Sequence, residues 1–174
     1  MGKKELREFE IQFVNLPTGE HQYDFDIQPT FFQLFPETMV DHGDGKVHLL
    51  LKKTDNMLTL LFEISGSLTL TCDVSLKNYL QPIHISKRMM VKFGEEASEP
   101  DDEVVIIPFD QISINVAPWI HEFINLEIPM KKIHPDLINE ERPDLAYTTH
   151  SDEEATDNEI DPRWEVLKKL KNKN

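Results

Sequence analysis

Between Leu58 and Val74 the apolar side chains recur at every second residue, and this pattern constrains the fold more than any other in the chain. A period of two directs apolar side chains to one face of a β-sheet. Gly66 lies on the apolar side at the centre of the run, where a glycine often marks a bulge or a bend. The segment is therefore either two strands or one long bent strand. The apolar positions are Leu58, Leu60, Phe62, Ile64, Leu68, Leu70, Cys72 and Val74.

Shorter alternating runs predict further strands on both sides of this segment. They lie at 9–13, 23–27, 47–51, 83–93 and 104–109. Turn-forming residues fill 41–45 and 53–56, and the second of these is a plausible hairpin turn. The connections are too short for helical crossovers, so we expect mainly antiparallel pairing.

The spacing changes to a helical one after the last of these runs. Asn115 is the candidate N-cap of this helix, Pro118 is tolerated in its first turn, and Pro129 ends it. We therefore predict an α+β fold: a mainly antiparallel, strongly bent sheet or partly open barrel with a central helix and a short C-terminal amphipathic helix. The apolar positions at intervals of three and four are Val116, Trp119, Ile120, Phe123 and Ile124.

Three regions are expected along the chain. Residues 1–130 form a single α+β domain, and residues 131–160 form an acidic flexible linker because they are polar and poor in bulky apolar side chains. Residues 161–174 form a helix, for which Asp161 is a strong N-cap and Pro162 suits the first position. We expect this helix to dock on the domain, although a partner is a second possible docking surface.

The charge of the chain excludes several classes of protein. Its 174 residues include 18 Lys and Arg against 32 Asp and Glu, a net charge of −14. A simple basic nucleic-acid binder needs the opposite excess, and an anionic membrane surface would repel this chain. No apolar run approaches the roughly 20 residues that cross a bilayer. No signal peptide is evident either, so we expect a cytoplasmic acidic protein without membrane association.

The sequence contains no arrangement typical of an enzyme or of a cofactor site. We interpret Cys72 as a buried inert thiol rather than a ligand or nucleophile. His121 is interpreted as a paired surface histidine rather than a general base, and His134 has no identifiable partner. The run 95–103 is acidic without a basic residue, and we interpret it as a solvated loop. We therefore predict no enzymatic activity, no cofactor and no metal.

Four stretches form a recognisable set: 66–76 with Gly66 and Cys72, 114–130 with Trp119, Glu122 and Pro129, the position of His134, and Asp161-Pro162-Arg163-Trp164. Taken together, they resemble the YceD family, the large ribosomal RNA subunit accumulation proteins. The resemblance implies a role in the accumulation or processing of large-subunit ribosomal RNA, and it carries over no catalytic residue.

One departure from the family concerns zinc. Ser75 stands where zinc-type members have the second cysteine of a Cys-x-x-Cys pair, and no cysteine follows His134. A closed tetrahedral site needs four ligands. We therefore expect no structural zinc in this chain.

The preferred hypothesis is a non-enzymatic factor for large-subunit ribosomal RNA accumulation and ribosome assembly. An acidic protein binds a basic ribosomal protein, or a precursor particle that contains one, more readily than naked RNA. The acidic stretches 95–103 and 152–161 would then face the partner.

Two alternatives remain open. The first is direct binding of ribosomal RNA through local basic patches. The second, less favoured, is a metal-dependent nuclease that uses clustered carboxylates. In the segment 161–164 we favour helix capping and packing over an interface formed by Arg163 and Trp164. The candidate RNA contacts are Lys87, Arg88, Lys92, Lys168 and Lys169.

Overall fold

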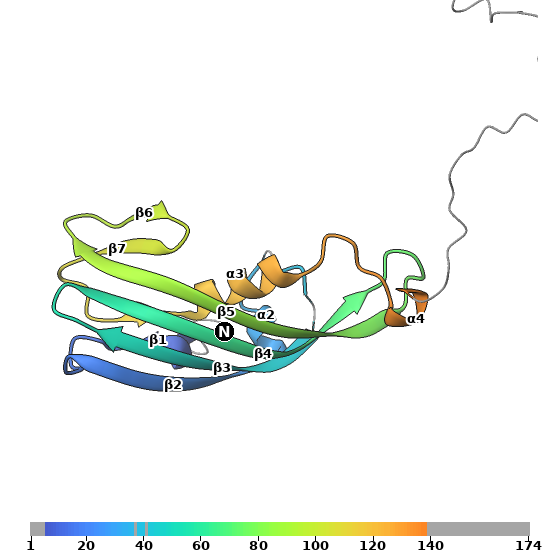
Figure 1. Cartoon of the computed structure of the whole chain (residues 1–174), viewed down its shortest axis with the longest axis horizontal. Coiled ribbons are helices and arrows are strands. Elements are labelled where there is room, and N and C mark those ends of the chain that lie inside the picture. Colours follow the sequence, from blue (N-terminus) through green and yellow to red (C-terminus); the bar gives the residue numbers. More distant parts are fainter. Residues whose placement is uncertain (1–5, 37, 41, 139–174) are drawn as a thin grey trace, which may run out of the picture. The chain divides into compact units, whose positions relative to one another are not determined.

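A computed structural model of the chain describes residues 6–36, 38–40 and 42–138. Its main feature is a six-stranded sheet with two free edges, so the sheet is not closed into a barrel (Figure 1). In spatial order the strands are β2 (Gly19–Ile27), β3 (His42–Lys53), β4 (Met57–Thr71), β5 (Asn78–Gly94), β7 (Val104–Pro108) and β6 (Ser98–Asp101).

The remaining elements are short, apart from one helix. They confirm the predicted α+β class with a central helix, which is α3. The predicted C-terminal helix at 161–174 lies outside the described residues. The elements are the 3-10 helix η1 (Leu6–Phe9), the paired strands β1 (Glu10–Ile11) and β8 (Ile114–Asn115), and the helices α2 (Pro29–Phe32), α3 (Ala117–Glu127) and α4 (Pro135–Ile138).

The long alternating segment forms a single strand, β4, at the centre of the sheet. Its inward side chains from Leu58 to Leu70, and Cys72 directly after it, are at most 3% exposed. Helix α3 packs on this face, where the rings of Phe62 and Phe123 lie 5.4 Å apart. The alternation fails only at Val74, which is 54% exposed because the strand ends at Thr71 and the chain turns.

Residues 42–45 belong to strand β3, so the turn predicted at 41–45 is wrong for these residues, and two facing glycines, Gly45 of β3 and Gly66 of β4, explain why. Strand β3 already begins at His42, and Gly45 lies directly opposite Gly66. A Cβ atom on Gly66 would lie 2.2 Å from the carbonyl oxygen of Asp44, and one on Gly45 would lie 2.7 Å from that of Ser65. Both residues are therefore glycine because the two backbones approach closely, not because the chain turns.

Pairing is antiparallel as predicted, except between β5 and β7. These strands run parallel, from Met90 opposite Val104 to Gly94 opposite Pro108. The exception arises because the segment interpreted as a solvated loop contains β6. Strand β6 pairs antiparallel with β7 at the outer edge, and β7 then returns between β6 and β5.

Three strands are longer than predicted, because β2, β3 and β5 each begin four or five residues before the predicted runs. The hairpin turn at 53–56 is confirmed, with the Thr54 N–H donating to the Met57 carbonyl at 3.0 Å. The strand predicted at 9–13 is reduced to the two residues of β1, although its three apolar side chains are buried. Helix α3 begins after Val116, and Asn115 accepts the Ala117 N–H at 2.9 Å, one position earlier than an N-cap. Pro129 follows directly on the last turn, as predicted.

Candidate functional site

Among the residues on which the family resemblance rests, which we call the family-like positions, Cys72 and His134 meet where β4 passes into β5. The Cys72 side chain is inaccessible to solvent. Its Sγ accepts the backbone N–H of His134 at 3.3 Å and that of Ser75 at 3.5 Å. The segment that follows α3 is therefore held against the β4–β5 turn.

A second pair of residues strengthens the same junction. The Asp73 N–H donates to the Lys132 carbonyl at 2.8 Å, and the Lys132 N–H donates to Asp73 Oδ2 at 2.7 Å. The Lys132 ammonium group lies 3.9 Å from Asp73 Oδ1. Sequence reasoning missed this pair because no pattern relates the two residues, which lie 59 positions apart in the chain.

The residues at this junction do not fit a zinc site. Cys72 offers one thiol, and Ser75 offers a buried hydroxyl that has no hydrogen-bond partner among the described residues. The His134 ring turns instead toward Tyr79, edge to face at 5.7 Å between centroids. Across the described ranges, no three histidine, cysteine or carboxylate side chains converge in a geometry that would hold a metal ion. Hydrogen bonds join the β4–β5 turn to the segment that follows α3.

The environment of Cys72 favours its thiolate. The nearby Ser75 hydroxyl and the N–H groups of Ser75 and His134 lower the pKa of the thiol from 9.0 to about 7, against the opposing effect of burial. The Ser75 hydroxyl makes no hydrogen bond of ordinary geometry, whereas the two N–H donors to Sγ do, and they act on the pKa in the same downward direction. The lowered pKa still leaves a group that solvent does not reach, which agrees with the interpretation of Cys72 as a packed thiol.

Two other family-like positions, Trp119 and Glu122, lie on α3 beside the acidic segment. A cavity of about 320 Å³ separates α3 from β6, and residues of both line it. Four carboxylates and the half-buried Trp119 ring face this space, without a lysine or arginine among the lining residues. We name this the acidic pocket, and its lining residues are Met89, Glu99, Pro100, Asp101, Asp102, Val105, Pro118, Trp119 and Glu122.

His121 is not the surface histidine that the sequence predicts. Its side chain is 9% exposed and stacks on Phe35, with 4.0 Å between ring centroids and 11° between planes. The Asn125 amide nitrogen lies 3.2 Å from its Nε2. Burial lowers the pKa of His121, so the neutral ring is favoured. The helical spacing of His121 from the buried Ala117 and Ile124 is a signal that indicates burial.

The candidate RNA contacts on β5 do not form one cluster. Consecutive strand residues face opposite sides of a sheet, and so Lys87 lies opposite Phe62 while Arg88 lies opposite Leu61. Arg88 already pairs with Glu103 at 3.1 Å. Lys92 shares the face of Arg88. The other family-like and basic candidates, Lys168 and Lys169 together with 161–164, lie outside the described residues.

The described residues thus define a sheet-rich α+β protein in which Cys72 and His134 lie at a hydrogen-bonded junction and Trp119 and Glu122 line an acidic pocket. The chain belongs to the YceD family, since the model of the family described as large ribosomal RNA subunit accumulation protein YceD matches residues 60–171. It is similar to the uncharacterized protein YlbN of Bacillus subtilis (strain 168), at 32% identity over 114 residues that cover 63% of each chain. No solved structure matches the chain. No helix in the described part is both long and apolar enough to span a membrane.

Proposed function

We propose that this protein is a non-enzymatic cytoplasmic factor for large-subunit ribosomal RNA accumulation and processing that acts by binding a basic ribosomal protein. The membership of the YceD family supports the ribosomal role. The observation that carries the binding mode is the acidic pocket, where Trp119 and Glu122 face the carboxylates of 99–102. A lysine or arginine of the partner would find both an aromatic face and opposite charge there.

Direct binding of ribosomal RNA is the second candidate. It needs a continuous basic surface, and on β5 the three candidate residues divide between two faces, with Arg88 in an ion pair. The four carboxylates of the acidic pocket would repel phosphate. These placements favour a protein partner over RNA.

The test is affinity recovery of the tagged full chain from a native lysate at low and moderate salt, with nuclease-treated controls. We expect a basic large-subunit protein or precursor particle to be recovered, to survive nuclease and to be lost at moderate salt. Recovery that disappears with nuclease would instead favour direct RNA binding. Recovery of neither would contradict a ribosomal role for this chain.

A pair of variants locates the interaction. Glu99→Gln with Asp102→Asn removes two charges from the acidic pocket, and we expect it to reduce recovery of the partner severalfold. Asp110→Asn with Glu127→Gln removes two exposed charges elsewhere and serves as the matched control. Equal losses in both pairs would show that only net charge matters and would reject the acidic pocket as the site.

A further inference from the structure

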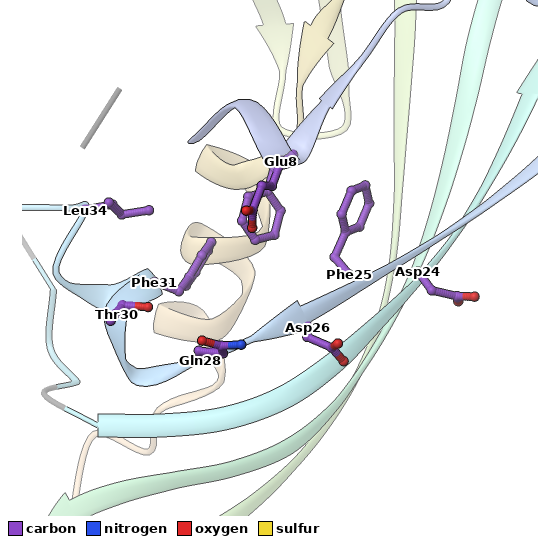
Figure 2. Close-up of a pocket in the computed structure, with 9 residues that line it drawn as sticks. Glu8, Asp24, Phe25, Asp26, Gln28, Thr30, Phe31 and Leu34 are labelled. Carbon is purple, nitrogen blue, oxygen red and sulfur yellow. The ribbon is translucent and has the colours of Figure 1, made fainter. Parts of the chain in front are cut away.

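A second open pocket, of about 530 Å³, lies at the opposite edge of the sheet beside β2. Figure 2 shows Phe25 of β2 and Phe31 of α2 directed toward the same space, with Glu8 of η1 above them. All of its lining residues precede the part of the chain that the family model matches. We name it the edge pocket, lined by Glu8, Phe9, Asp24, Phe25, Asp26, Gln28, Thr30, Phe31 and Leu34.

A continuous cluster of aromatic rings lies behind the mouth of the edge pocket, in which Phe9 and Phe25 stack while Phe31 and Phe35 meet edge to face. Phe9 is central, with its ring centroid 5.2 Å from that of Phe25 and 5.2 Å from that of Phe31. Phe31 continues to Phe35 at 5.3 Å. Phe9 and Phe31 are nearly buried, whereas Phe25 is half-buried at the mouth. Tyr23 also lies nearly parallel to Phe25, with 6.4 Å between ring centroids, so Phe25 offers a rigid aromatic wall at the mouth.

The charge at this mouth is negative. Glu8, Asp24 and Asp26 line it, and no lysine or arginine does. Asp24 pairs with His48, whereas neither Glu8 nor Asp26 has a cation within 4.0 Å among the described residues. The ligand that complements the pocket is therefore cationic, and phosphate groups are disfavoured.

The strand beside the pocket has an open edge. Within the described residues, the nine-residue β2 pairs only with β3. The outer backbone N–H and C=O groups of an edge strand are available to an extended peptide. Because Asp24, Phe25 and Asp26 belong to this same strand, a peptide added along β2 passes the mouth of the edge pocket.

We propose that β2 and the edge pocket bind an extended arginine-rich segment of a basic partner protein. One arginine enters the pocket beside Phe25, where its N–H groups donate to Glu8, and Asp26, which projects from the opposite side of β2, adds negative charge at the mouth. Arginine suits this role better than lysine because it combines a flat face with several donors. The identity of the partner rests on the proposed function, whereas the chemistry of the site rests on the pocket itself.

The test uses the full chain and a fluorescent nine-residue peptide of alternating arginine and valine, with a citrulline peptide as the uncharged analogue. Anisotropy is expected to show binding of the arginine peptide that is at least tenfold tighter than that of the citrulline peptide. Glu8→Gln with Asp26→Asn should weaken binding about tenfold, and Phe25→Leu about fivefold. Asp110→Asn with Glu127→Gln, the matched control, should stay within twofold.

Hydrogen exchange distinguishes pairing of the peptide with β2 from nonspecific electrostatic attraction. Peptide binding should protect amides of β2 and leave those of β6, at the other edge, unchanged. Thermal unfolding of each variant verifies that it is folded. Equal weakening by the control pair, absent protection of β2, or tighter binding of a single-stranded RNA than of the peptide would each overturn the proposal.

Failure of this proposal is distinguishable from failure of the proposed function. If a basic ribosomal protein is recovered equally well by wild type and by the Phe25→Leu and Glu8→Gln/Asp26→Asn variants, the edge pocket is rejected and the ribosomal role stands. If the arginine peptide binds with the expected variant pattern but no ribosomal partner is recovered, the pocket chemistry stands and the ribosomal role is rejected.

Discussion

Cys72 shows how a single buried side chain joins distant segments. Because the neighbouring Ser75 hydroxyl and the backbone N–H donors lower the folded pKa to about 7 from 9.0, the unfolded chain binds more protons in this range. The stabilisation is fully present above pH 9 and is lost as pH falls through 7. We therefore expect urea midpoints of the wild type to rise between pH 7 and pH 9 relative to those of Cys72→Ala. Parallel curves for the two proteins would contradict a shifted thiol.

His121 also favours its deprotonated form in the folded protein, but the cause is burial rather than hydrogen bonding. Burial lowers its pKa, so folding favours the neutral ring, and stability is present above about 6.5 and lost as pH falls below that value. His121→Phe keeps an aromatic ring on Phe35 but cannot titrate. We expect the fall in melting temperature from pH 7 to pH 5 to be smaller in this variant than in the wild type. An equal fall would assign the acid sensitivity to other groups.

The close approach of β3 and β4 gives the sharpest prediction for a single element. Gly66→Ala places a methyl group against the backbone of Asp44 and Gly45, which cannot move without separating the strands. The expected loss in the free energy of unfolding is about 2–4 kcal/mol. Ser65→Ala, on the exposed face beside it, is the control and should change stability by less than about 0.5 kcal/mol. Urea unfolding measures both, and a mild effect at Gly66 would show that the sheet can relax there.

Asn115 connects the start of α3 to the N-terminal segment. Its Oδ1 accepts the Ala117 N–H at 2.9 Å and its Nδ2 donates to the Leu6 carbonyl at 2.8 Å. Asn115→Ala should lower the free energy of unfolding by about 1–2 kcal/mol. Asn115→Asp keeps the acceptor and loses the donor, so it should lie between the two. Chemical denaturation of the three proteins tests this order.

The elements that the sequence predicts well are those with one buried face. The alternation of β4 and the helical spacing of α3 follow directly from burial, and both are observed. Strand β6 was missed because all four of its residues are exposed, so no apolar period marks it. The parallel pairing of β7 was missed for the same reason, since the direction of β7 follows from β6. The edge pocket combines residues from three elements, and no local pattern brings η1 next to β2.

In the part of the chain that the structure describes, two groups of carboxylates lie where side chains also form cavities. Both the acidic pocket and the edge pocket are lined by carboxylates without a lysine or arginine. Such arrangements oppose folding through like-charge repulsion, while they attract basic partners. A chain with net charge −14 that retains them is more consistent with selection for binding than for stability.

This argument predicts that neutralising the acidic pocket stabilises the isolated protein. Glu99→Gln with Asp102→Asn relieves repulsion with Asp101 and Glu122 across the pocket, so the free energy of unfolding should rise by about 0.5–1 kcal/mol at low salt. The gain should shrink in 0.5 M salt, where screening acts over about 4 Å. Asp110→Asn with Glu127→Gln, which lies outside the pocket, should give a smaller gain at low salt. A loss of stability in the first pair would mean that these carboxylates hold the fold together, and their use for a partner would then need separate support.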